Sequence, residues 1–267
     1  MAFATASIIA GTALGVIAVV SGCSKVSPTA PASSAPASSA ATSSPRAPAS
    51  PASGADAFTV TGDHPVQPNG SQDTSAATPD TRCNRGRLAT DKTLGSRISA
   101  GFTLAGYSVS AQLLQHFLSG KGTEVSYQAG SAISAEARAS SAFTTVTSQV
   151  QGAIMAQLKA GRMHVQLSAA QLPLVAFESA TSDLYWGFRG TQGLAVTGAG
   201  SRENGRFTGT LTYVIRDSYG FPADDTLGGF GAPMRYLQTV CGAPEHASGA
   251  RWFPDTITVT VPFSEPT

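Results

Sequence analysis

A long segment poor in large apolar side chains limits where this chain can form a folded core. Residues 24–82 are dominated by Ser, Pro, Ala and Thr, as in the run Ser-Pro-Thr-Ala-Pro-Ala-Ser-Ser at 27–34. Such a segment cannot offset the entropy of ordering its backbone, and its prolines favour extended polyproline II stretches. We therefore predict a disordered tether over residues 23–82 and a single folded domain over residues 83–267. A short apolar patch at 58–60 is expected to dock on that domain.

The charge balance excludes one class of partner. The chain carries 17 basic and 16 acidic residues, which gives a formal net charge of +1. Binding to nucleic acid through its phosphates requires a basic footprint, and none is present here. We therefore expect no nucleic-acid partner. The predicted domain is long enough to bury a self-sufficient core without a structural metal.

The first segment of the chain has the character of an export signal. Residues 2–20 are apolar or small and uncharged, and they lead into Val20-Ser21-Gly22-Cys23. This ending resembles the lipobox of bacterial lipoproteins, in which an aliphatic residue and two small residues precede a cysteine. The resemblance implies that residues 1–22 are a signal peptide and that Cys23 becomes the lipidated N-terminus.

An uncleaved membrane helix is the alternative for this segment, because about 18 to 20 apolar residues can just span a bilayer. The first basic residue is Lys25, whereas a signal peptide usually begins with a positive charge. Lys25 is nevertheless on the wrong side to retain such a helix by the positive-inside rule. Diacylglycerol on Cys23 supplies the two acyl chains that stable anchoring needs. We expect an extracytoplasmic protein held on the cell membrane, with cell-wall or envelope components as further partners.

The remaining cysteines, Cys83 and Cys241, lie far apart in the predicted domain. Outside the cytoplasm such a pair tends to oxidise, so we predict a disulfide between them. The alternatives are two free thiols, or Cys241 as a nucleophile with His246 five residues beyond it.

Apolar residues at helical spacing predict two helices in the first half of the domain. Residues 111–118 follow Ser110 as an N-cap, and residues 135–160 follow Ser134. Gly161 is expected to end the second helix.

The second half alternates apolar and polar residues, which predicts strands. The clearest hairpin joins 194–197 to 210–215 through Asn204-Gly205, the preferred pair for a type I′ turn. Further strands are predicted at 163–167, 174–177 and 256–261. The fold class is therefore α+β, with N-terminal helices followed by an antiparallel sheet or partial β-barrel.

A polar, irregular stretch after the hairpin is the candidate site. Asp217, Tyr219, Asp224 and His246 are the candidate catalytic residues, with Asp217 or Asp224 as general base and His246 as acid. Aromatic and basic groups in the same region are candidates for binding, and they are Tyr236, Arg251 and Trp252. Turn formation by Asp217 and core packing by Trp252 are the structural alternatives.

The order Asp217, Tyr219, Phe221 resembles the catalytic segment of the colicin M family, which cleaves the lipid-linked peptidoglycan precursor. That family has a second Asp where this chain has Gly220, and its His follows sooner than His246 does here. The stretches Gly-Thr-Leu-Thr-Tyr and Arg-Asp-Ser-Tyr-Gly-Phe also resemble uncharacterised actinobacterial proteins.

Motifs for common cofactors and metals are missing from the sequence: it has no phosphate-binding loop, CxxC, HExxH or GxSxG. A calcium loop is a third possibility for the candidate site, since Asp217, Asp224 and Asp225 offer oxygen ligands, but their spacing does not match that of an EF-hand. We expect no cofactor and no metal. The resulting hypothesis is a surface-exposed, non-enzymatic lipoprotein that binds a ligand or envelope component. The alternative is a cell-envelope hydrolase that uses Asp217 and His246.

Overall fold

The computed structural model describes residues 57–67, 82–222, 229–243 and 248–267. All of these residues belong to one compact unit. These residues form six α-helices and a six-stranded sheet. The predicted α+β class is confirmed, and the sheet is open rather than closed into a barrel.

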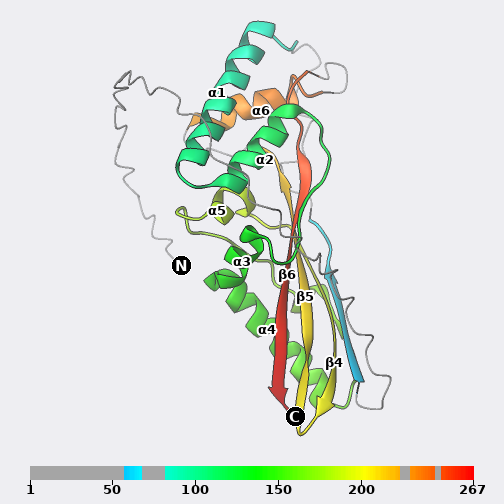
Figure 1. Ribbon diagram of the computed structural model, residues 1–267. Coiled ribbons are helices and arrows are strands. Elements are labelled where there is room, and N and C mark those ends of the chain that lie inside the picture. Colours follow the sequence, from blue (N-terminus) through cyan, green and yellow to red (C-terminus); the bar gives the residue numbers. More distant parts are fainter. Residues whose placement is uncertain (1–56, 68–81, 223–228, 244–247) are drawn as a thin grey trace, which may run out of the picture. The chain divides into compact units, whose positions relative to one another are not determined.

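The sheet has the strand order β2-β6-β5-β4-β1-β3 (Figure 1). The pairs β1–β3 and β2–β6 are parallel and the others are antiparallel, so the sheet is mixed, not purely antiparallel as expected. Both edge strands are short, which limits unpaired backbone at the edges. The strands are β1 (Ala57–His64), β2 (Val125–Tyr127), β3 (His164–Leu167), β4 (Gly193–Glu203), β5 (Arg206–Tyr219) and β6 (Phe253–Pro266).

The predicted hairpin is confirmed as β4 and β5. Asn204 has φ 51° and Gly205 has φ 72°, as the central residues of a type I′ turn require. The pairing continues from this turn to Gly193 opposite Arg216.

Strand β1 lies inside the sheet, between β4 and β3, although its residues fall within the predicted tether. Its side chains alternate: Phe58 and Val60 are buried, whereas Thr59 and Thr61 are exposed. Phe58 makes edge-to-face contacts with Phe207 and Phe263 of the long strands. The folded region therefore begins by residue 57, and the predicted docking patch is an internal strand.

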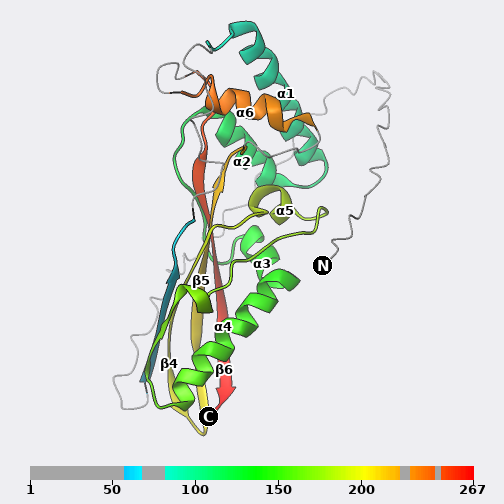
Figure 2. The ribbon, with the colours of Figure 1, turned by 180° about the vertical axis from the view of Figure 1, so that it is seen from behind.

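The helices gather in two places (Figures 1 and 2). Three of them lie near one end of the sheet: α1 (Arg85–Leu104), α2 (Ser108–Ser119) and α6 (Gly231–Thr239). Toward the other end, α3 (Ala132–Ala139) and α4 (Ser141–Lys159) lie alongside β5 and β6. A short helix, α5 (Asp183–Phe188), lies between the two groups.

The long helix predicted over residues 135–160 is in fact two helices. Ser140 has extended backbone, with φ −71° and ψ 145°, and it ends α3 and begins α4. Its hydroxyl donates to the Ala137 carbonyl at 2.7 Å and accepts from the Phe143 N–H at 3.2 Å. One serine therefore caps both helices, a feature that apolar periodicity alone does not predict.

The other predicted elements differ in extent. The helix predicted at 111–118 is α2, which begins earlier, after Tyr107. Gly161 follows α4 with φ 78°, as expected of a residue that ends a helix. The segment 174–177 forms only one isolated bridge, between Ala176 and Gly190, and not the predicted strand.

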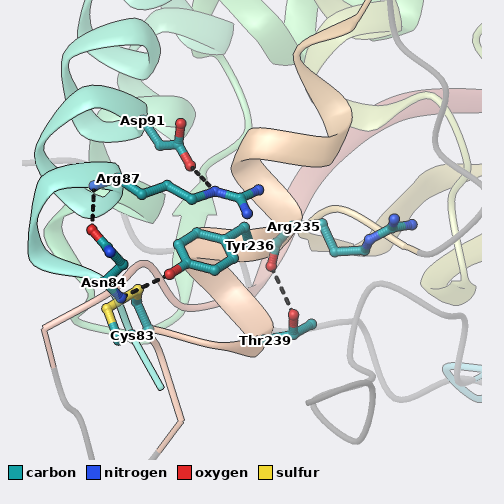
Figure 3. Close-up of a disulfide and its surroundings, with 8 residues drawn as sticks. Cys83, Asn84, Arg87, Asp91, Arg235, Tyr236 and Thr239 are labelled. Carbon is teal, nitrogen blue, oxygen red and sulfur yellow. Dashed lines mark hydrogen bonds and ion pairs between the residues drawn. A yellow bond between two sulfur atoms is a disulfide. The ribbon is translucent and has the colours of Figure 1, made fainter. Parts of the chain in front are cut away.

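The predicted disulfide between Cys83 and Cys241 is present (Figure 3). The two Cα atoms are 4.9 Å apart, and the bond joins positions separated by 158 residues. It links the residue before the N-cap of α1 to the chain just after α6.

Candidate functional site

The structure places two of the predicted catalytic residues near the end of β5, where Asp217 and Tyr219 are both buried. Asp224 and His246 lie outside the described residues. The predicted pairing of Asp217 with His246 therefore has no described geometry.

A second carboxyl group lies opposite Asp217. Asp217 and Asp255 are direct partners in the antiparallel register of β5 and β6. Directly opposite residues place their Cβ atoms about 4.5 to 5.5 Å apart on the same face of a sheet. Asp217 is 7% exposed and Asp255 is 0% exposed, so both carboxyl groups lie in the protein interior.

The two carboxyl groups have unequal hydrogen bonding. Asp217 Oδ1 accepts from Gln192 Nε2 at 3.1 Å and from the Ser218 N–H at 2.8 Å. In the described part of the chain, neither oxygen of Asp255 has a hydrogen-bond partner on another residue, although its own backbone N–H acts to lower its pKa. An unpaired ionised carboxylate in the interior is strongly disfavoured, so Asp255 is expected to be protonated.

Burial sets the protonation of the pair. It raises the pKa of Asp217 to about 8, although the hydrogen bonds from Ser218 and Gln192 act in the opposite direction. Burial also raises the pKa of Asp255 far above its ordinary value, and the negative charges of Asp217 and Glu124 add to this rise. At neutral pH Asp217 is therefore mainly protonated, a state suited to donating a proton rather than to the predicted role of general base.

The groups around the pair are aromatic and acidic. Tyr219 stacks on Phe253 with ring centroids 5.4 Å apart, beside the pair on the same two strands. Burial raises the pKa of Tyr127 to about 12, with further contributions from the charges of Asp255 and Asp183. Asp255 is fully buried and Asp217 nearly so, which leaves little surface for contact with a substrate in this conformation.

Asp183 has a structural role. Its carboxylate accepts from the N–H groups of Val109 at 2.8 Å and Ser110 at 2.7 Å, and also from the Ser110 hydroxyl. These donors have no partner within the helix, because they lie at the start of α2. Asp183, the first residue of α5, therefore connects α5 to the N-terminus of α2.

The predicted binding residue Tyr236 is engaged within the fold (Figure 3). Its hydroxyl accepts from the Asn84 N–H at 2.8 Å, and the guanidinium of Arg87 lies 3.7 Å from its ring centroid. Arg87 also pairs with Asp91 at 3.3 Å. Tyr236 thus connects α6 to the start of α1 beside the disulfide.

The other two predicted binding residues, Arg251 and Trp252, are partly exposed and precede β6. The Arg251 N–H donates to the carbonyl of Phe117, in the last turn of α2. The structure gives no contact that joins these two residues to Tyr236 in one site within the described residues.

A groove lies away from the predicted site, between the α3–α4 corner and the loop before α5. Its volume is about 730 Å³. Apolar lining residues include Val146, Leu174 and Phe177, and acidic lining residues include Glu136 and Glu178. Sequence reasoning missed this groove because its walls come from a helix break and from a loop that alternation marked as a strand.

None of the comparisons with known proteins returns a match: no family model, curated protein or solved structure matches the chain. In the described residues, no helix is both long and apolar enough to cross a bilayer. The same residues contain no group of three or more His, Cys, Asp or Glu side chains that could hold a metal ion.

Proposed function

We propose that this chain is a lipid-anchored, extracytoplasmic lipoprotein whose folded part binds a ligand or envelope component. The groove beside α4 is the observation that carries the binding role. Its volume of about 730 Å³ lies within the range of small-molecule sites, roughly 300 to 1,000 Å³. Its apolar walls with a few polar groups match the usual composition of such sites.

Two features support an extracytoplasmic location. The lipobox-like ending Val20-Ser21-Gly22-Cys23 provides the attachment point, and the Ser/Pro/Ala-rich segment after it provides a spacer. The disulfide between Cys83 and Cys241 is typical of oxidising compartments outside the cytoplasm.

The positions of the polar groups favour a binding role over hydrolysis. Asp217, the predicted base, is buried opposite another carboxyl group and is mainly protonated at neutral pH. The groove, by contrast, is accessible and carries polar groups on its walls.

Mass spectrometry of the membrane fraction tests the anchor. We expect a mature N-terminus at Cys23 that carries diacylglycerol, and we expect Cys23→Ala to abolish both the lipid and the membrane association. Recovery of the wild-type chain with residues 1–22 still attached and no lipid would contradict the proposal.

Native mass spectrometry tests the binding role. The full chain with Cys23→Ser, incubated with a small-molecule extract of the cell envelope, should retain a component that Ala139→Trp no longer retains. Ala139 is exposed and lines the groove, so an indole there occupies the groove without entering the core. Equal retention by both variants would contradict binding at this place.

A further inference from the structure

We infer that the groove beside α4 takes a small amphipathic cation, an organic amine with an apolar body. This inference rests on the proposed binding function and adds the chemical class of the ligand. It depends on three features of the groove: its apolar walls, its charge and the fixed position of one carboxylate.

Apolar side chains from two separate segments provide the walls. Val146 comes from α4, and Leu174 and Phe177 come from the loop before α5. Val146 and Phe177 are anchored in the core, where they are 5% and 3% exposed. An apolar ligand body gains about 25 cal/mol for each Å² that these walls remove from water.

The charged groups on the groove are all of one sign. Glu136 and Glu178 both line it, and none of the described lining residues is Lys, Arg or His. A ligand with a positive head group therefore has two candidate partners, whereas an anionic head group meets repulsion from both.

The carboxylate of Glu136 is held in place. Its Oε1 accepts from the Ser182 hydroxyl at 2.8 Å, and Ser182 Oγ itself accepts from the Leu184 N–H at 3.1 Å as the N-cap of α5. A carboxylate fixed by a helix cap loses less side-chain entropy when a ligand binds.

Two helix N-termini act against a cation. That of α4 borders the groove through Ser141 and Ala142, and that of α5 borders it through Ser182. A helix N-terminus is equivalent to about half a positive charge. Two carboxylates carry more negative charge than the two helix ends together carry positive charge. The net field in the groove favours a cation.

Isothermal titration calorimetry with three probes of equal chain length tests the inference. The protein is the full chain with Cys23→Ser, and the probes are n-octylammonium, n-octanoate and n-octanol. We expect saturable binding of n-octylammonium, weaker binding of n-octanol and no binding of n-octanoate. Glu136→Gln or Glu178→Gln should each weaken n-octylammonium binding about threefold, and the double variant about tenfold.

Glu203→Gln is the matched control. Glu203 also accepts a serine hydroxyl, from Ser201 at 2.7 Å, but it lies at the end of β4 and does not line the groove. Its substitution should leave n-octylammonium binding unchanged.

Three results would overturn the inference: binding of n-octanoate as tight as that of n-octylammonium, no loss of affinity in the double variant, or no binding of n-octylammonium. If the chain retains an envelope component in an Ala139-dependent way but does not bind n-octylammonium, the proposed function stands and the ligand class is wrong. If neither binds, both are wrong.

Discussion

At the scale of single residues, the interior of this protein carries two carboxyl groups that face the same side of adjacent strands. Asp217 and Asp255 could not both be ionised there, because burial and mutual repulsion act in the same direction. The folded state therefore keeps protons that the unfolded chain would release. This difference in proton binding makes stability depend on pH.

We predict that the free energy of unfolding falls as pH rises between about 4 and 8. The pKa of Asp217 is about 8 in the folded state against an ordinary 3.8, so its stabilising proton is fully retained at acid pH and lost as pH rises through the folded pKa. Each retained proton contributes a slope of about 1.4 kcal/mol per pH unit. Urea titrations across this pH range measure the slope.

Asp217→Asn should reduce this slope, and the double variant with Asp255→Asn should nearly abolish the part due to the pair. Asp63→Asn is the control, because Asp63 is largely exposed and pairs with Arg216. A wild-type slope that the double variant leaves unchanged would show that the pair does not retain the proton.

Two tyrosines make a second residue-scale comparison. The hydroxyl of Tyr213 is buried without a hydrogen-bond partner among the described residues, whereas the hydroxyl of Tyr236 accepts from Asn84. Removing an unsatisfied buried group relieves its desolvation penalty, so Tyr213→Phe should stabilise the fold by about 1 to 2 kcal/mol. Tyr236→Phe should destabilise it by about 1 kcal/mol. Equal shifts of the same sign in denaturant unfolding would refute this account.

Asp255 shows why sequence reasoning found only half of the carboxyl pair. Its side chain lies on the buried face of β6, together with those of Phe253, Ile257 and Val259. The predicted strand begins at residue 256, so the prediction does not include Asp255 among the buried residues of that strand. Asp217 was identified because it stands in a polar run, but its partner depends on register, which the sequence does not state.

At the scale of elements, a local signal was predictive where one dipeptide controls the backbone, whereas the predicted N-caps Ser110 and Ser134 lie inside α2 and α3. Asn204-Gly205 located the hairpin, because both residues must take positive φ. Strand β1 was missed because its partners, β3 and β4, come about a hundred or more positions later, beyond the range of any local pattern. The groove also depends on packing between separate segments, residues 136–149 and 173–184.

The shared cap between α3 and α4 allows an element-scale prediction. Ser140→Ala removes the hydroxyl bonds to Ala137 and Phe143, and should destabilise the fold by about 1 kcal/mol. Thermal unfolding measures the loss. Ser141→Ala, one position further along, leaves both caps in place and should have little effect. If both substitutions cost the same, the cap does not determine the helix break.

At the scale of the whole folded unit, the disulfide is a covalent connection between distant parts of the sequence. It closes a loop of 158 residues and joins the chain before α1 to the chain after α6. Nearby contacts span the same junction: Asn84 and Arg87 both contact Tyr236 (Figure 3). The disulfide therefore reinforces a packed corner rather than holding two free ends.

We predict that the Cys83→Ser, Cys241→Ser double variant folds but loses stability, with an upper limit of about 5 kcal/mol from loop-closure entropy. The loss should be uneven, because the junction of α1 and α6 depends directly on the bond whereas the β4–β5 hairpin does not. Hydrogen exchange should therefore quicken first in α1 and α6, before the hairpin amides respond. Uniform quickening across all elements would contradict a local role. The double variant should have the same free energy of unfolding as the wild-type chain under reducing conditions. That result would show that the junction of α1 and α6 reaches its full stability only in an oxidising compartment, as the proposed location implies.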